Sequence, residues 1–377
     1  MPFAPHQFTH VAGHGCVNEL NFLLSAVETS LAPPSAKPAS PGATGPVDPL
    51  RLIELARLNK LINVLPDKAE ALPEGCGGLV AQIGQARLLS AMMNQRGLEA
   101  AAGITRLLTA QGIDHVHLKG PLQQVELYGS YHQKPSADTD LLVRPADRLE
   151  AGRVIQDEGY RAKDSQIALW WRLYLHERHF DHPERGTMID LHHGLHQPGV
   201  PRPRNTESFL DTARDMTFQG TTFRIPDARH RVLLASISIV KAIIGREPAL
   251  SAVVDLRAAH DKLTPEDRRS MMPLARALRL ERVWMFAMRF VEAVFPAVPM
   301  PDFDDTPALP GLEADTLRAM IATPWVEDLP WLRRHLILSD LCGKDRLRYM
   351  HESAQSVLSG LFRKSLEMRA SLKGKAE

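Results

Sequence analysis

Several features that would point to a compartment or a partner are scarce in this sequence. Cysteine occurs three times in 377 residues, at Cys16, Cys76 and Cys342, without paired spacing. This scarcity argues against a disulfide framework and a Cys-type zinc site, and it favours a reducing compartment. The N-terminus lacks the basic start and apolar core of a signal peptide, and no apolar run approaches a membrane span. We therefore expect a cytoplasmic protein that does not enter the membrane.

Net charge is also nearly absent. Lysine and arginine number 45 against 44 aspartate and glutamate residues, which leaves a formal charge of +1. No overall field therefore draws the chain to nucleic acid or anionic lipid, and the basic segment Arg363 to Glu377 has no interleaved aromatic residues. A charged partner must be met by a local site, and the oligomeric state stays open.

Proline-rich stretches and changes in periodicity divide the chain. The segment Leu31 to Pro49 holds six prolines and is interpreted as a linker. Asp48 followed by Pro49, ahead of a helical apolar repeat, predicts the start of the folded body. We expect an N-terminal extension and linker (1–47), a helical lead-in (48–112), a strand-containing domain (113–226) and a helical C-terminal domain (227–377). The predicted fold class is α/β or α+β, with a small mixed sheet between helical parts.

The stretch His115 to Val143 reads HVHLKGPLQQVELYGSYHQKPSADTDLLV and predicts a strand, a glycine turn, a helix and a second strand. Gly120 stands where the strand turns into the helix, and Pro121 occupies the first helical position. Free backbone N–H groups and the helix dipole at that turn can hold a phosphate. Lys119 could add a positive charge there, although a solvent-exposed lysine at a strand end is equally ordinary.

Two aspartates open the second predicted strand. Asp138 and Asp140 project to the same face, and the following apolar run is typical of a buried central strand. Two neighbouring carboxylates repel each other unless a divalent cation lies between them, and Mg²⁺ prefers such oxygen ligands. The alternative is that one aspartate caps a turn and the other faces solvent.

A third carboxylate follows on the strand-like segment TMIDLH, where Asp190 is placed to stand beside Asp140. Three carboxylates on adjacent strands would hold two cations and activate a hydroxyl for in-line attack. His192 lies two positions further along and points the same way, so it is a candidate for orienting Asp190 or a phosphate. A satisfied polar residue at a strand end is the alternative for Asp190.

These residues together carry a family resemblance. The pattern LKG-x₇-Y, then KPSADTDLLV, then Gly159-Tyr160 and IDLH is similar to the uncharacterised nucleotidyltransferase-like family, a branch of the polymerase-β-type nucleotidyltransferase superfamily. The resemblance covers roughly Asp48 to Leu263 and implies a nucleotidyltransferase-type sheet. It also implies roles for four residues: a nucleotide-binding turn at Gly120, and metal ligands at Asp138, Asp140 and Asp190.

Three positions depart from the family pattern. Lys134 stands where the family usually has Arg, which keeps a charge for a phosphate but loses the planar fork for bidentate contact. Ala137 replaces a usual Gly, and His193 replaces a common Trp. The three metal-binding carboxylates are intact, so these changes bear on nucleotide affinity and selectivity.

The resemblance implies an Mg²⁺-dependent nucleotidyltransferase, with Mn²⁺ as the other candidate metal. It would move a nucleoside monophosphate from an NTP, with ATP the first candidate, to a hydroxyl or other nucleophile, and pyrophosphate would leave. The acceptor is left open among small molecules, proteins and RNA. No separate general base is evident, and Asp190 is the best candidate. Lys241, on a predicted helix, is a candidate triphosphate contact, with a solvated or structural role as its alternative.

Two other functions stay open at this point. One is a regulatory module that keeps the nucleotide-binding sheet without transfer. The other is a metallohydrolase with zinc or iron on clustered histidines, namely His176, His179, His182, His192, His193 and His196. The aromatic residues Trp170, Trp171 and Tyr174 could stack a nucleobase, but such spacing more often packs a helix onto a sheet.

Overall fold

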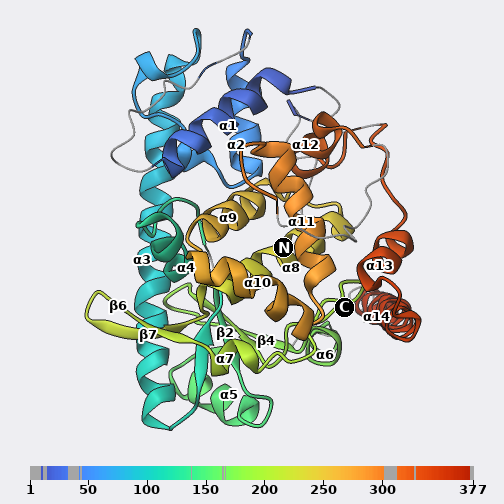
Figure 1. Ribbon diagram of the computed structural model, residues 1–377. Helices are drawn as coiled ribbons and strands as arrows, with labels where there is room; N and C mark the ends of the chain where they lie inside the picture. Colours follow the sequence, from blue (N-terminus) through green and yellow to red (C-terminus); the bar gives the residue numbers. More distant parts are fainter. Residues whose placement is uncertain are drawn as a thin grey trace.

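A sheet at one end of the molecule and a body of helices above it make up the fold (Figure 1). The computed structural model describes residues 10–11, 15–32, 42, 45–136, 138–163, 165, 167–300, 312–326 and 328–373. Most of the expected proline-rich linker and Ala137 lie outside these described residues, as do 301–311 of the expected loop from Pro296 to Pro310. The fold is mixed α/β, as the sequence predicts.

The main sheet has five strands in the order β1-β2-β5-β4-β3. Its strands are β1 (His115–His117), β2 (Asp138–Val143), β5 (Met188–His192), β4 (Glu177–Asp181) and β3 (Arg161–Ala162). The β2 and β5 strands pair in parallel, and all other pairs are antiparallel. The sequence indicated β1, β2 and β5, but it did not indicate β3, which has only two residues, or β4, which directly follows an aromatic segment.

Side chains that alternate along these strands give the sheet two different faces. On one face, Leu141, Val143, Phe180 and Ile189 form an apolar cluster with helix α5 (Arg148–Asp157) and the end of α3 (Val80–Ala110). The opposite face carries the aspartates of β2 and β5. The sheet is therefore anchored by its apolar face, which leaves the other free for polar side chains.

The helical body combines helices that precede the sheet in the sequence with helices that follow it. Before the sheet come α1 (Val17–Leu31), α2 (Pro49–Leu58) and α3, with the short turns η2 (Ile62–Val64), η3 (Ala69–Ala71) and η4 (Gly77–Leu79). Within the sheet region lie α4 (Pro121–Tyr128), α5, α6 (Ala168–Trp170), the π-helix η5 (Trp171–Leu175), α7 (Ser208–Asp211) and the hairpin β6 (Arg214–Phe218) and β7 (Thr221–Ile225). After it come α8 (Ala228–Gly245), α9 (Leu250–Asp261), α10 (Pro265–Ala277), α11 (Glu281–Val294), α12 (Ala314–Ala322), α13 (Arg334–Cys342) and α14 (Arg346–Lys373).

The largest apolar core joins helices from both ends of the chain. Phe22 and Leu23 of α1 are buried in the same cluster as Leu55 of α2 and Phe286 and Phe290 of α11. The N-terminal helices therefore contact the C-terminal helices directly. The expected domain limits stay predictions. Among the described segments, no helix has the length and apolar character needed to cross a membrane.

Local sequence explains the start of helix α2. Asp48 accepts hydrogen bonds from the backbone N–H groups of Leu50 and Arg51 at the start of α2, as its position before proline predicts. The long helix α3 runs unbroken through Gly97 and Gly103 and spans the height of the molecule in Figure 1. Tertiary contacts on both sides of α3 outweigh the low helix propensity of two glycines.

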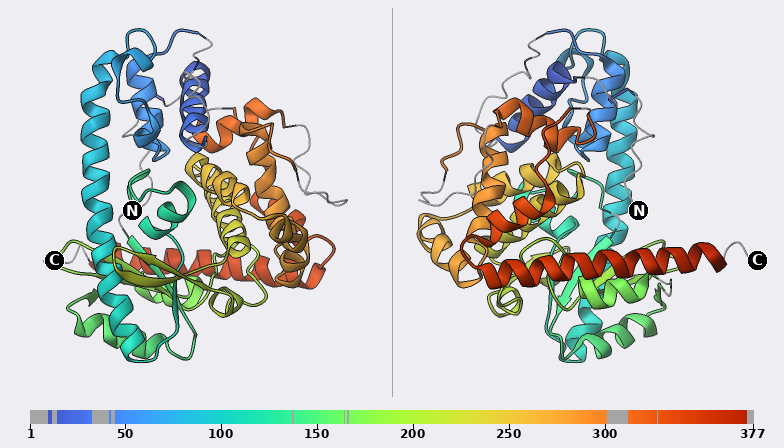
Figure 2. Two further views of the ribbon diagram at one scale, coloured as in Figure 1. Left: turned by 60° about the vertical axis from the view of Figure 1, so that its left-hand side comes forward. Right: turned by 90° about the vertical axis from the view of Figure 1, so that its right-hand side faces the viewer.

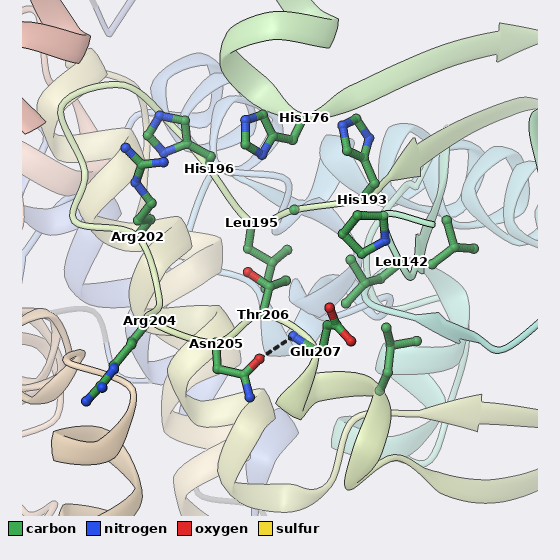
Figure 3. A pocket seen from close by; sticks show the side chains of 14 residues that line it. Leu142, His176, His193, Leu195, His196, Arg202, Arg204, Asn205, Thr206 and Glu207 are labelled. Carbon is green, nitrogen blue, oxygen red and sulfur yellow. Dashed lines mark hydrogen bonds between the residues drawn. The ribbon is translucent and has the colours of Figure 1, made fainter. Parts of the chain in front are cut away.

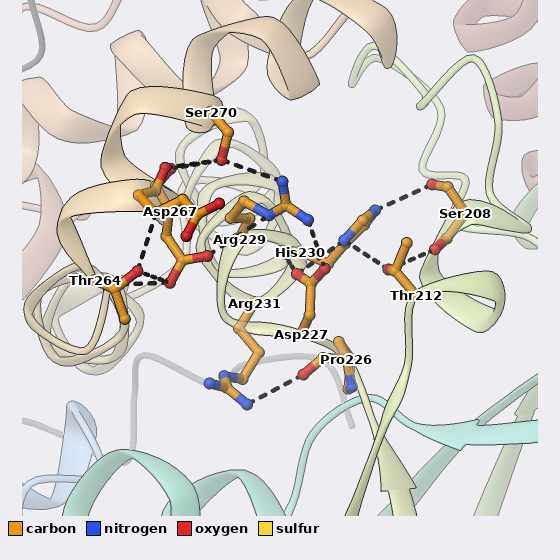
Figure 4. Close-up of polar contacts among 11 residues, drawn as sticks. Ser208, Thr212, Pro226, Asp227, Arg229, His230, Arg231, Thr264, Asp267 and Ser270 are labelled. Carbon is orange, nitrogen blue, oxygen red and sulfur yellow. Dashed lines mark hydrogen bonds and ion pairs between the residues drawn. The ribbon is translucent and has the colours of Figure 1, made fainter.

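A polar cluster fixes helix α8 beside the sheet (Figure 4). Asp227 caps α8 by accepting a hydrogen bond of 2.8 Å from the backbone N–H of His230, and the buried imidazole of His230 contacts the Thr212 hydroxyl at 3.0 Å. Arg229 donates to Ser270 of α10 at 3.2 Å. These contacts set the direction in which α8 leaves the hairpin.

Candidate functional site

The three aspartates lie together on one face of the sheet. Asp140 pairs with Asp190 in the parallel register of β2 and β5, and Asp190 pairs in turn with His179 of β4. Asp138 projects to the same face as Asp140 because it lies two positions before it in the strand. The expected placement of Asp190 beside Asp140 is confirmed.

A chain of alternating carboxylates and imidazoles links the two paired aspartates. His192 contacts Asp140 at 3.1 Å through Nε2 and Glu177 at 3.4 Å through Nδ1. The other oxygen of Glu177 contacts His179 Nε2 at 3.1 Å, and His179 Nδ1 contacts Asp190 at 2.5 Å. All five side chains are less than a fifth exposed, so these contacts are shielded from solvent.

The ionisation of this network follows from its contacts. Burial alone would raise the pKa of Asp140, but the hydrogen bond from His192 and the charges of Lys119 and Lys241 lower it to about 2. Burial disfavours charge on His179, yet its bonds to Asp190 and Glu177 raise its pKa to about 9. Asp140 is therefore ionised and His179 positively charged near neutral pH.

The pKa of Asp138 is raised, whereas that of Asp140 is lowered. Burial raises the pKa of Asp138, and the negative charges of Asp140 and Asp190 raise it further, while Lys60 lowers it. No salt bridge to Asp138 is present within the described part of the chain. Three acidic groups thus crowd one point, where added positive charge would be favourable.

Lysines from three separate elements surround the carboxylates. Lys119 precedes α4 and Lys241 lies on α8, and the charge of each lowers the pKa of Asp140. Both expected phosphate contacts are therefore close to the carboxylates. Lys60, just after α2, approaches Asp138. Sequence reasoning did not single it out, because it lies far from Asp138 in the sequence and in an irregular turn, where its φ is +56°.

Gly120 begins helix α4 in a conformation that other residues avoid. Its φ is +86° and its ψ is −155°, and Pro121 follows at the first helical position as predicted. A Cβ at Gly120 would lie 3.4 Å from the backbone oxygen of Asp138. The glycine turn and the aspartate strand are therefore in direct contact.

The loop that leads into Asp138 is held by two fully buried amides. Asn94 of α3 donates to the backbone oxygens of Tyr131 and Lys134 and accepts from the N–H of Ser136. Gln124 of α4 makes hydrogen bonds of 3.0 Å with both the N–H and the oxygen of Lys134. Sequence reasoning missed both amides, because nothing local distinguishes them from other polar helix residues.

The ammonium group of Lys134 is engaged inside the protein. It pairs with Asp255 of α9, which also accepts a hydrogen bond of 2.5 Å from the hydroxyl of Tyr128. The lysine side chain is 18% exposed. In this arrangement Lys134 joins the loop to α9, so its expected phosphate contact would require it to leave Asp255. Asp255 does not pair with Arg257, which bonds Asp261 instead.

The carboxylate oxygens of the three aspartates are suitable ligands for a divalent metal, but these side chains are not arranged to bind one. Within the described residues, no group of three or more His, Cys, Asp or Glu side chains is placed to hold a metal ion. Asp140 and Asp190 each contact an imidazole, so they would have to turn toward Asp138. Carboxylate oxygens are nevertheless the ligands that Mg²⁺ prefers, and the crowding at Asp138 is relieved by a cation.

The chain was then compared with known families. Residues 45–296 match the model of a family described as "Uncharacterised nucleotidyltransferase". This chain belongs to that nucleotidyltransferase family. No curated protein matches it. The matched range begins three residues before Asp48 and includes the sheet, all three aspartates and Lys241, which agrees with the expected resemblance from about Asp48 onward.

Most residues that the sequence indicated for the alternative functions lie away from the carboxylates. His182 contacts the backbone of the turn at Glu184 and Arg185, and the metallohydrolase alternative has no ligand set among the described residues. Trp170 bonds Ser359 and packs on α14 rather than on the sheet. Trp171 is the exception, because its ring lies 4.3 Å from that of His179.

Two of the network residues, Glu177 and His179, were not assigned to the site by sequence reasoning. The strand Glu177–Asp181 reads ERHFD, in which Phe180 is the one apolar residue, so it lacks the alternation that indicates a strand.

Proposed function

We propose that this nucleotidyltransferase transfers a nucleoside monophosphate from an NTP to a hydroxyl or other nucleophile of an acceptor, with release of pyrophosphate. The observation that carries the proposal is the register of Asp140 opposite Asp190, with Asp138 on the same face and three lysines around them. Such a group combines negative charge for metals with positive charge for a polyphosphate.

Each residue has a distinct part in this proposal. Asp138 and Asp140 would hold both metals, and Asp190 would hold the metal nearer the acceptor and is the candidate to receive its proton. Bound Mg²⁺, or Mn²⁺, would neutralise phosphate charge and polarise the phosphorus centre. Gly120 supports the phosphate by backbone N–H groups, because a residue with positive φ lets the chain approach closely.

Lys119 and Lys241 would neutralise the triphosphate, and His192 and His179 would hold the orientation of Asp140 and Asp190, which they contact. The hydrogen bond from His192 lowers the pKa of Asp140 and so keeps that carboxylate ionised. ATP is the first candidate donor. The acceptor is a small molecule, a protein or RNA.

One observation favours a second function. Lys134, at the position of the family's phosphate-binding Arg, forms an ion pair with Asp255. A chain that binds nucleotide but does not turn it over would tolerate that pairing. Nucleotide sensing without transfer is therefore the competing proposal.

Incubation with each labelled NTP, Mg²⁺ and cell extract tests the two functions. The wild type should release pyrophosphate and transfer label, and the double variant Asp138→Asn/Asp140→Asn should give only background. Asp157→Asn, an exposed carboxylate on α5, is the matched control and should behave as the wild type. Transfer that survives the double substitution would refute the assignment. Nucleotide binding without any transfer would favour the sensor.

A further inference from the structure

A cavity lined by histidine and arginine lies just beyond the end of β5, next to the aspartate face (Figure 3). Its volume is about 260 Å³. His193, which lines it, directly follows His192, the residue that contacts Asp140. Nothing in the proposed transfer uses this cavity.

Three imidazoles stand in a row along its upper wall in Figure 3. The rings of His176 and His193 are stacked with centroids 5.3 Å apart, and those of His176 and His196 are 5.6 Å apart. Burial lowers the pKa of His193 to about 4 and that of His196 to about 3. All three rings are therefore neutral at physiological pH, and each offers one N–H donor.

His196 is the least satisfied of the three. Its side chain is 9% exposed, and neither ring nitrogen has a hydrogen-bond partner among the described residues. A buried polar atom without a partner costs about 1–3 kcal/mol, so such atoms are rare in a native fold unless something occupies the space beside them. The unpaired nitrogens point to a ligand.

Positive charge is present on the same wall. Arg202 lies beside His196 in Figure 3, and its charge lowers the pKa values of both His196 and His176. The acids nearby are engaged, because Glu352 bonds Arg202 Nε at 3.1 Å and Glu207 bonds Arg144 at 2.7 Å. Arg202 also contacts His351 through Nη2 at 3.2 Å, which leaves its other terminal nitrogen as a donor. The ring N–H groups and the positive charge of Arg202 suit an anion, and that charge opposes a metal cation.

The backbone is adapted to hold His176 in place. This residue follows the π-helix Trp171–Leu175 and has a left-handed φ of +56°. A Cβ at Gly194 would lie 2.6 Å from His176 Nδ1, so the ring fits only because residue 194 is glycine. Strained backbone and π-helices persist mainly where a side chain must be aimed at a site.

We propose that this cavity binds a phosphate group, held by the ring N–H donors of His176, His193 and His196 and by the guanidinium of Arg202. The small volume suits a phosphate with little attached to it. The proposal does not rest on nucleotidyl transfer, because phosphate binding can be measured without turnover. The phosphate has two sources to distinguish: the nucleotide itself, or a separate phosphorylated ligand.

Calorimetric titration with inorganic phosphate in chloride buffer tests the site. His196→Phe and His193→Phe keep the ring volume and remove the donors, and each should weaken phosphate binding by about tenfold or more. His260→Phe is the matched control, since His260 is also a buried histidine with an unpartnered nitrogen but lies on α9. It should bind phosphate as the wild type does.

A second measurement on the wild type guards against misfolded variants. Phosphate should shift the ring NMR signals of His176, His193 and His196 and leave those of His260 in place. The proposal would be overturned if the wild type did not bind phosphate or if both variants kept the wild-type affinity. It would also be overturned if zinc shifted these rings and phosphate did not.

Competition between an NTP and inorganic phosphate identifies the source of the bound phosphate. If an NTP displaces inorganic phosphate from the wild type, the cavity holds a phosphate of the nucleotide. If both bind together, it holds the phosphate of another molecule. Phosphate binding retained by Asp138→Asn/Asp140→Asn without transfer activity would separate this site from the proposed function.

Discussion

Individual residues at the site are constrained by backbone shape as much as by chemistry. Gly120 combines φ +86° with ψ −155°, a region that is essentially limited to glycine. A Cβ added at Gly120 would lie 3.4 Å from the backbone oxygen of Asp138, so a larger residue there would press on the aspartate strand.

We predict that Gly120→Ala lowers the free energy of unfolding by about 1–3 kcal/mol, because the Cβ forces the residue out of this conformation. Gly103→Ala on α3 is the control, since nothing lies within 4 Å of its added Cβ. It should raise stability by up to about 1 kcal/mol through helix propensity. Urea denaturation measures both, and equal effects would contradict the explanation.

Glu177 illustrates a residue that acts through others. It contacts both His192 and His179, which in turn hold Asp140 and Asp190. We predict that Glu177→Gln lowers transfer activity by about 10–100-fold and raises the Mg²⁺ concentration needed for half-maximal rate, because the carboxylates lose their orientation.

The exposed Glu184→Gln should leave both the rate and the Mg²⁺ requirement unchanged. A loss of rate in Glu177→Gln at an unchanged Mg²⁺ requirement would mean that Glu177 does not position the metal ligands. Thermal unfolding of both variants checks that neither has lost its fold.

At the scale of elements, the loop between α4 and β2 decides where Asp138 lies. This loop has no regular structure and is fastened by Asn94 from α3 and Gln124 from α4. A single buried amide on α3 therefore transmits the position of that helix to the carboxylate site.

We predict that Asn94→Ala lowers stability by about 1–3 kcal/mol, because it leaves buried carbonyls unpaired, and that it also lowers the rate of transfer. Asn59→Ala is the matched control: Asn59 is equally buried and bonds the backbone oxygens of Leu55 and Ala322, away from the loop. It should lose stability but keep kcat. Equal kinetic losses in the two variants would argue against a role in positioning.

At the scale of the whole molecule, several histidines are buried in the neutral form. Burial lowers the pKa of His117 to about 3 and that of His260 to about 4, against about 6.5 in an unfolded chain. The unfolded state therefore binds more protons below pH 6.5. The stability that these groups contribute is present above that pH and is lost as the pH falls toward the folded-state values.

We predict that the free energy of unfolding declines between about pH 6.5 and pH 4, by at most about 1.4 kcal/mol per pH unit for each such histidine. Urea titrations at a series of pH values measure this slope. His260→Gln should flatten it, because glutamine does not titrate. A slope unchanged by that substitution would assign the acid loss to other groups.

The long C-terminal helix shows how local and global information differ. Arg363 to Glu377 has the composition of a solvated end, yet α14 continues to Lys373 and runs across the molecule beside the sheet region (Figure 2). Trp170 packs on it and bonds Ser359. No short-range pattern predicts that a segment near residue 170 will meet one near residue 360.

The sequence by itself determined the strand β2 with its two aspartates, the glycine turn at Gly120 and the partnership of Asp190, because alternation and turn chemistry act over a few residues. Tertiary structure alone decided that His179 and Glu177 complete the network, that Lys60 approaches Asp138, and that Lys134 turns to Asp255. These contacts join segments far apart in the chain, and their energies depend on burial that exists only once the helices have packed over the sheet.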